Sequence, residues 1–202
     1  MTKVLLDFDG VVFCNKQIHQ YVEHRSVEFV KHRWKLSDIE AKKTNKKSYK
    51  THGHTCLGFE DANGELLQDY NNFVFDTNIP YDAVNQNDQK RMKRIIDIKN
   101  DRNLDIYVCT NATLDYCVNI MNKMKLPFDY LFSTQYIFTS DTLNAMKPTQ
   151  IFFDKVSENV SHEIAFFDDS MMNINSAARN DWDSYYITHE NQLFDKLKYF
   201  KD

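Results

Sequence analysis

The sequence predicts an α/β protein with a doubly wound parallel sheet and a small helical segment inserted after the first strand. Three observations support this prediction. Short β-rich runs alternate with amphipathic helical patterns along most of the chain, the clearest strand candidates end in polar residues, and one long stretch near the N-terminus interrupts the alternation.

Four runs rich in β-branched and aromatic residues are predicted to be strands. The first, at residues 3–8 (KVLLDF), is apolar up to its acidic end, which is typical of a parallel strand buried on both faces. The others lie at residues 104–110, 163–169 and 183–188. Ligands of such sheets bind at the carboxyl ends of the strands, so we expect the polar residues there to form one site.

Apolar residues at three- and four-residue spacing predict helices at residues 88–99, 114–125, 148–156, 171–180 and 191–199. Residues 15–82 lack the alternation and are predicted to form a mostly helical cap, with its clearest helices at 27–33 and 36–42. Pro80 marks the return to the sheet. The expected organisation is a Rossmann-like catalytic core of residues 1–14 and 83–202 with a cap of residues 15–82.

The composition is that of an ordinary globular protein. The chain has 202 residues, of which 42% are hydrophobic and 27% are charged, and no apolar run approaches the roughly 18–20 residues that cross a membrane. The net charge of −4 is spread along the chain, which argues against a nucleic-acid partner. The lysine-rich residues 40–50 favour a solvated helix face over a polyanion site.

Cysteine usage and the N-terminal residues favour a cytoplasmic location. The four cysteines show neither CxxC pairing nor the density of a disulfide scaffold, so reduced thiols are expected. The apolar stretch at the N-terminus is interrupted by two acids, which is unlike a secretory signal.

Two pairs of acids follow predicted strands. Asp7 and Asp9 flank the end of the first strand with Gly10 beyond them, and strand periodicity places both carboxylates on the same side. Asp168 and Asp169 end another apolar run. Because like charges at close range are costly, such acids need a shared proton or a cation. Carboxylates without clustered His or Cys are the oxygen environment that Mg²⁺ prefers.

A softer metal site is the alternative in the segment HGHTC. His52, His54 and Cys56 could ligate zinc, but their spacing matches no standard zinc pattern. Magnesium at the acids is the favoured interpretation.

Two further residues could bind a phosphate group. Thr110 ends a predicted strand, where its hydroxyl and the backbone N–H of Asn111 could bind phosphate oxygens, and Lys147 could supply a compact positive charge. Taken singly, Thr110 could equally be a turn or capping residue, and Lys147 a solvated side chain.

In chain order, DFDGVV, TN, KP and FFDDS resemble the four motifs of the haloacid dehalogenase (HAD) superfamily, over nearly the whole chain. The resemblance implies a Mg²⁺-dependent phosphomonoester hydrolase in which Asp7 is the nucleophile and Asp9 the general acid and base. Thr110 and Lys147 would hold the phosphoryl group. The implied metal ligands are Asp169, its partner Asp168, Asp7 and the backbone carbonyl of Asp9. The dehalogenase branch lacks the second Asp, so Asp9 points to phosphoryl transfer.

The cap sequence is similar to that of the pyrimidine 5′-nucleotidase branch, with Tyr49, Gly53 and Gly58 at matching positions. This resemblance implies a small phosphorylated metabolite as partner, such as a pyrimidine nucleoside monophosphate. Tyr49 and His54 could stack on or hydrogen-bond a base, although aromatic residues in a cap also form its own core.

Three alternative functions remain at this point: a phosphosugar phosphatase, a phosphomutase, or a non-catalytic interaction protein that keeps the fold. The role of Asn173, which follows the second acidic pair, and the oligomeric state are left open by the sequence.

Overall fold

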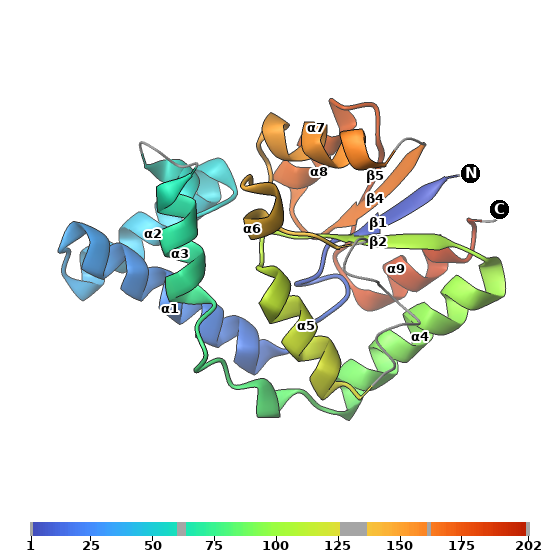
Figure 1. Cartoon of the computed structure of the whole chain (residues 1–202), viewed down its shortest axis with the longest axis horizontal. Helices are drawn as coiled ribbons and strands as arrows, with labels where there is room; N and C mark the ends of the chain where they lie inside the picture. Colours follow the sequence, from blue (N-terminus) through green and yellow to red (C-terminus); the bar gives the residue numbers. More distant parts are fainter. Residues whose placement is uncertain (1, 60–63, 126–136, 161–162, 201–202) are drawn as a thin grey trace.

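The protein forms a five-stranded parallel sheet with helices on both faces (Figure 1). This computed structural model describes residues 2–59, 64–125, 137–160 and 163–200. The strands, in the spatial order β3-β2-β1-β4-β5, are β1 (Lys3–Leu6), β2 (Asp105–Cys109), β3 (Ile137–Phe138), β4 (Ile164–Asp168) and β5 (Asp183–Tyr186). The predicted fold class is confirmed.

Both faces of the central strands are buried. Val4 and Leu6 contact one hydrophobic cluster and Leu5 contacts the other, because successive side chains of a strand point to opposite faces. One face is covered by α4 (Gln86–Arg102), α5 (Leu114–Lys123) and α9 (Glu190–Leu197), and the other by α7 (Gln150–Asn159) and α8 (Met171–Ala178). The sheet is therefore held as the middle of three layers.

These five helices confirm the predicted ones, with shifts of a few residues at their ends. Capping explains part of the difference: the Asn85 side chain accepts a hydrogen bond from the backbone at the start of α4, two residues before the predicted helix. The two-residue strand β3 and the short helix α6 (Ser140–Leu143) were not predicted, because such short elements contain no measurable periodicity. Across the described ranges, no helix combines the length and apolarity that a membrane span needs.

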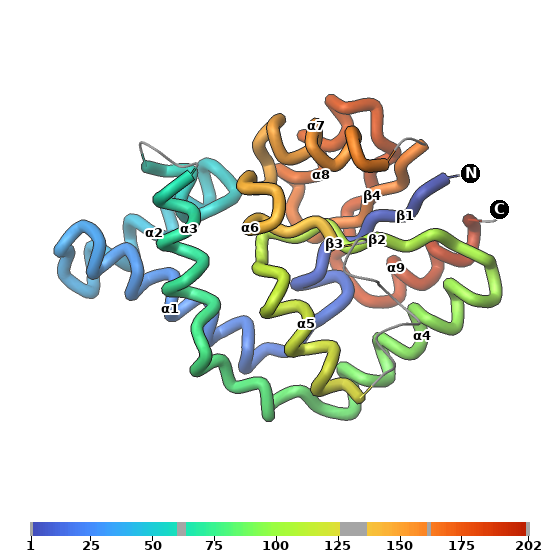
Figure 2. Tube along the Cα trace, viewed as in Figure 1, coloured from blue at the N-terminus to red at the C-terminus, as the bar shows by residue number. Residues whose placement is uncertain are grey.

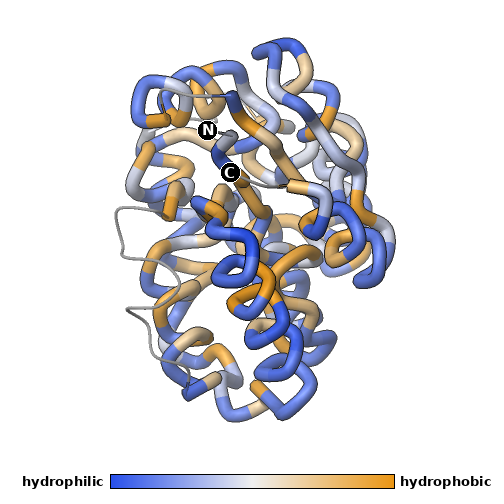
Figure 3. The backbone as a smooth tube through the Cα atoms, turned by 90° about the vertical axis from the view of Figure 1, so that its right-hand side faces the viewer, coloured by the Kyte–Doolittle hydropathy of each residue, from blue (hydrophilic) through white to orange (hydrophobic). Residues whose placement is uncertain are grey.

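Among the described residues, three α-helices lie between β1 and α4, and we call them the cap: α1 (Lys16–Trp34), α2 (Asp38–His52) and α3 (Glu65–Val74). The predicted helix at 27–33 is part of α1, and the predicted helix at 36–42 overlaps the start of α2, which follows the N-cap residue Ser37. Both helices continue through polar residues that carry little hydrophobic periodicity. Buried apolar residues of the cap, including Phe29 and Tyr70, form a separate small core. The hydropathy colouring of Figure 3 shows hydrophilic and hydrophobic residues alternating along the helices. The lysines at 42, 43, 46, 47 and 50 are exposed on α2.

The segments that lead into and out of the cap lie side by side. Asn15 caps α1 by accepting from the backbone N–H groups of Gln17 and Ile18. Its Nδ2 donates to the Ala83 carbonyl at 2.9 Å and to Asp88 Oδ2 at 2.8 Å. One side chain thus joins the segment that enters the cap to the segment that leaves it. From there the cap helices extend beside α6 and the carboxyl edge of the sheet (Figure 2).

Candidate active site

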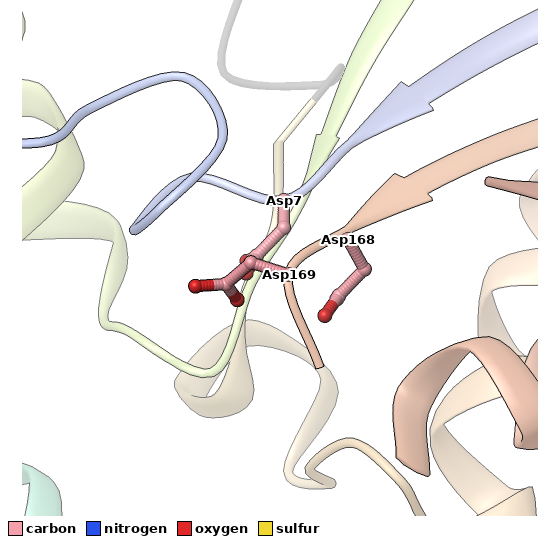
Figure 4. Close-up of side chains that lie close together, drawn as sticks. All are labelled: Asp7, Asp168 and Asp169. Atoms are coloured by element: carbon pink, nitrogen blue, oxygen red, sulfur yellow. The ribbon is translucent and has the colours of Figure 1, made fainter. Parts of the chain in front are cut away.

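Three aspartates meet at the carboxyl edge of the sheet. Asp7 follows β1, Asp168 ends β4, and Asp169 comes next (Figure 4). Because Leu6 pairs with Phe167 in the parallel register, both strands deliver their acids at the same level. One carboxylate oxygen from each residue lies within 4.8 Å of the others. The convergence of these three acids was predicted from the strand ends.

Lys147 lies between two of these carboxylates and is 1% exposed. Its Nζ is 2.9 Å from Asp7 Oδ1 and 2.6 Å from Asp168 Oδ2. Burial disfavours the charged ammonium, but the nearby charges of Asp168 and Asp7 outweigh burial and raise the pKa of Lys147. The lysine therefore stays protonated and offsets part of the negative charge.

Asn111, which lies just after the end of β2, fixes the backbone of Lys147. Its Oδ1 accepts a hydrogen bond from the Lys147 N–H at 2.7 Å, and its Nδ2 donates to the Lys147 carbonyl at 2.9 Å. The side chain of Asn111 is thus a structural link, so only its backbone N–H remains for the phosphate contact predicted from the sequence.

Negative charge exceeds positive charge among these residues. Burial raises the pKa of Asp7 well above its ordinary value; Lys147 opposes this effect, and Asp168 and Asp169 add to it. Desolvation, followed by the charge of Asp168, raises the pKa of Asp169 to about 6. One ammonium does not neutralise three carboxylates. A divalent cation would favour their ionised forms.

Two further features fit a cation with oxygen ligands. A Cβ placed on Gly10, whose φ is +88°, would lie 2.1 Å from Asp169 Oδ2, so glycine lets this carboxylate lie directly against the loop after β1. Asn173 Nδ2 donates to both oxygens of Asp168 at 3.0 Å, while Asn173 Oδ1 is buried without a hydrogen-bond partner among the described residues. Asn173 therefore orients Asp168 and presents one unsatisfied oxygen. The atoms that these residues offer as metal ligands are all hard oxygens, which Mg²⁺ prefers.

Asp9 has different neighbours. Its Oδ1 accepts a hydrogen bond from Tyr116 Oη at 2.8 Å and lies 3.0 Å from His19 Nε2. Burial alone would lower the pKa of His19, but the hydrogen bond and charge of Asp9 raise it. Asp7 and Asp9 line the same cavity, but strand periodicity does not describe their positions, because β1 ends at Leu6 and the chain then turns. His19 and Tyr116 were missed, since no spacing links them to Asp9.

Thr110 follows β2 and is 1% exposed. Its N–H donates to the Phe138 carbonyl of β3 at 2.9 Å, and its Oγ1 accepts from the Ala112 N–H at 3.1 Å. The second bond leaves the hydroxyl proton of Thr110 available to an external acceptor.

A cavity of 430 Å³ separates the strand ends from the cap, within the size range of small-molecule sites. It brings together all but one of the residues predicted for the site: Asp7, Asp9, Tyr49, His54, Thr110, Asn111, Lys147 and Asp169. Asp168 is fully buried behind Lys147.

The residues predicted from the cap differ in exposure: Tyr49 is 55% exposed and His54 is 6% exposed. Gly53 also lines the cavity, whereas Gly58 packs against Ser48, whose Oγ a Cβ there would meet at 2.0 Å.

His54 is a buried neutral histidine. Burial lowers its pKa to about 4, and its Nδ1 accepts a hydrogen bond from the Cys56 N–H at 3.2 Å. The alternative zinc site is not formed: in the part of the chain that the structure describes, the three aspartates are the one cluster suited to a metal, and His52, His54 and Cys56 are not in it. Cys56, Cys109 and Cys117 are buried free thiols.

No protein-family model matches this sequence, and no curated protein matches it significantly. Solved structures do match. A HAD phosphatase from Thermococcus onnurineus superposes with a TM-score of 0.57 at 15% identity, covering 93% of this chain and 86% of that one. A hydrolase from Pseudomonas syringae gives 0.56 at 13% identity, covering 100% and 92%. An L-2-haloacid dehalogenase from Xanthobacter autotrophicus gives 0.54 at 11% identity, covering 93% and 78%. The chain has the Rossmann-like fold of HAD hydrolases.

The buried neutral state of His54 predicts a pH dependence of stability. Between its folded pKa of about 4 and its ordinary value of 6.5, the unfolded chain binds the proton and the folded chain does not. The free energy of unfolding should therefore fall as the pH drops from 6.5 to 4, by up to about 3 kcal/mol from this residue. We expect His54→Asn to lose this part of the dependence in urea unfolding between pH 7 and 4.5. Parallel curves for the two proteins would contradict the assignment.

Proposed function

We propose that this protein is a Mg²⁺-dependent phosphomonoester hydrolase that forms an aspartyl phosphate on Asp7. The observation that carries the proposal is the cavity floor, where Asp7, Lys147 and Asp169 lie together with a second acid, Asp9, that has its own hydrogen-bond partners. The fold is shared by phosphatases and dehalogenases. Asp9 favours phosphoryl transfer, because the resemblance to dehalogenases fails at that residue.

In this mechanism the Asp7 carboxylate attacks phosphorus, so the bond from phosphorus to the leaving oxygen breaks as the aspartyl phosphate forms. Lys147, the Thr110 hydroxyl and the Asn111 N–H would hold the phosphoryl oxygens. Mg²⁺ bound by Asp7, Asp169 and the Asp9 carbonyl, with Asp168 alongside, would offset phosphoryl charge and help orient the group for in-line attack.

Asp9 then acts as general acid and general base. Its two side-chain hydrogen-bond contacts within the described ranges, from Tyr116 and His19, are made to Oδ1, which leaves Oδ2 to carry the transferred proton. Asp9 would give this proton to the leaving oxygen and later take one from the water that hydrolyses the aspartyl phosphate. Tyr116 and His19 would keep the carboxyl group in one orientation through both steps.

The cavity size supports a small phosphorylated metabolite as the substrate. Tyr49 and His54 line the cap side, and the resemblance of the cap to pyrimidine 5′-nucleotidases suggests a pyrimidine nucleoside monophosphate. A phosphosugar phosphatase or a phosphomutase would use the same cavity floor, and products and substrate range separate these possibilities.

The acid cluster predicts a metal requirement. Phosphate release from an aryl phosphate should need Mg²⁺ and stop in excess EDTA, because the three carboxylates would then repel the phosphoryl group. Ca²⁺ should inhibit, since its larger coordination shell does not hold Asp7 in line with phosphorus. The measurement is a phosphate-release assay on metal-free protein with each ion added back. Full turnover in EDTA would rule out the magnesium assignment.

The separate surroundings of Asp7 and Asp9 predict separate defects. Asp7→Asn should lower kcat by at least about 1,000-fold and abolish the phosphoenzyme, whereas Asp9→Asn should lower it about 10²- to 10⁴-fold. Phosphoenzyme is followed by acid quench and mass spectrometry. Asp183→Asn is the control and should keep full activity, because Asp183 is exposed at the amino end of β5, away from the carboxyl ends of the strands that form the site. An active Asp7→Asn protein would overturn the covalent mechanism.

The cap residues predict a preference among nucleotides. We expect UMP and CMP to be hydrolysed with higher kcat/KM than AMP and GMP, by about 10- to 200-fold at most, because size exclusion discriminates modestly. Tyr49→Ala and His54→Ala should reduce the preference. Equal rates for purines and pyrimidines, or faster turnover of sugar phosphates, would exclude the nucleotidase while leaving the role of Asp7 intact.

A further inference from the structure

Within the part of the chain that the structure describes, the cavity offers no unpaired Lys or Arg side chain to a substrate. Lys147 is the only Lys or Arg among the described residues that line it, and its ammonium is already bound by Asp7 and Asp168. The internal ranges outside the described residues, 60–63, 126–136 and 161–162, contain neither Lys nor Arg in their sequences. The His19 ring is engaged by Asp9. Among the described residues that line the cavity, a second phosphate or a carboxylate on the substrate would therefore find only positive groups that are already paired with aspartates.

Glu23 adds a negative charge to the cap side of the same cavity. His19, Glu23 and Ser26 are four and three residues apart on α1, so they lie on one helix face, and all three line the cavity. Ser26 Oγ donates to the Val22 carbonyl at 2.9 Å and lies 2.7 Å from Tyr70 Oη. Glu23 is exposed, and within the described ranges no ion pair or side-chain hydrogen bond engages it. Its carboxylate is thus free to act on a bound molecule.

The remaining polar groups of the cap wall are uncharged donors. His54 Nδ1 accepts from Cys56, so the neutral ring carries its proton on Nε2. Asn45 Oδ1 accepts from Thr55 Oγ1 at 2.8 Å, which leaves Asn45 Nδ2 as a donor. Neither nitrogen has a hydrogen-bond partner among the described residues, and both side chains line the cavity. These groups suit a hydroxyl, a carbonyl or a ring nitrogen.

We propose that the cavity selects phosphate monoesters whose only anionic group is the phosphoryl group that is transferred, with Glu23 as the specificity-determining residue that repels a second anion. This inference rests on the proposed phosphatase function and narrows its substrate class. Neutral polar or cationic leaving groups are accepted. Bisphosphates, phosphorylated carboxylic acids and nucleoside polyphosphates are disfavoured, because specificity arises here from repulsion as well as from attraction.

Three phenyl phosphates test the proposal, with a 2-hydroxyethyl, a 2-aminoethyl or a carboxymethyl group in the para position. They have similar size and leaving-group acidity and differ mainly in charge. We expect kcat/KM of the first two to exceed that of the carboxymethyl ester by about 5- to 30-fold, the range expected for like charges in a partly solvated site. Glu23→Gln should reduce this ratio severalfold, and Glu23→Lys should bring it to one or reverse it.

Glu28→Gln is the matched control. Glu28 lies on α1 as well, carries the same charge and pairs with Lys31 and His32 outside the cavity. The ratio should be unchanged in this variant. A wild-type protein that hydrolyses the carboxymethyl ester as well as the hydroxyethyl ester would overturn the proposal, and so would Glu23 variants that keep the wild-type ratio.

Calorimetric binding of the three esters to Asp7→Asn separates the selectivity from the chemistry. If the wild type releases no phosphate from any ester but Asp7→Asn binds the carboxymethyl ester weakest, the proposed hydrolysis fails and the charge selection stands. If all three esters are hydrolysed and bound alike, the hydrolase stands and the charge selection fails. Absence of both turnover and binding would overturn both proposals.

Discussion

The charge balance at the carboxyl edge of the sheet is the constraint on which the rest of the site depends. The parallel register brings Asp7, Asp168 and Asp169 together, and a single ammonium, Lys147, lies between two of them. Desolvation of so many like charges costs several kcal/mol unless each is hydrogen-bonded or paired. Accordingly, Asn111 fixes the lysine backbone and Asn173 orients Asp168. The side chains of Asn111 and Asn173 take no part in the reaction; their hydrogen bonds stabilise the closely spaced charges.

A second consequence is a separation of roles between two acids only two residues apart. The turn after β1 removes Asp9 from the carboxylate cluster and gives it a hydroxyl and an imidazole as partners. Tyr116 comes from the core and His19 from the cap, so the orientation of Asp9 depends on both parts of the molecule. Displacement of α1 would remove one of its two contacts. The acid is thus fully oriented only when the cap lies as it does in this structure.

Sequence reasoning found the sheet, its principal helices and the residues at the strand ends, because buried parallel strands produce long apolar runs that stop at polar residues. It failed where the signal is short or tertiary. β3 has two residues and α6 has four, which is too few for a period to appear. His19 and Tyr116 are an ordinary helical histidine and tyrosine until the fold places them beside Asp9. Periodicity could not predict the hydrogen-bond partners of Asp9, because this residue lies beyond the last residue of β1.

The two hydrogen bonds that the Asn15 side chain donates indicate where the cap could be replaced by another segment. Because its side chain bonds both Ala83 and Asp88, the two points at which the chain leaves and rejoins the core are neighbours in space. Residues 16–82 are therefore an insertion whose two ends lie next to each other at the sheet domain. A different segment whose ends are equally close could be grafted between these points without altering strand order or register. Such a graft would change the walls that face the substrate, and it would also have to supply a partner for Asp9, because His19 lies within the replaced residues.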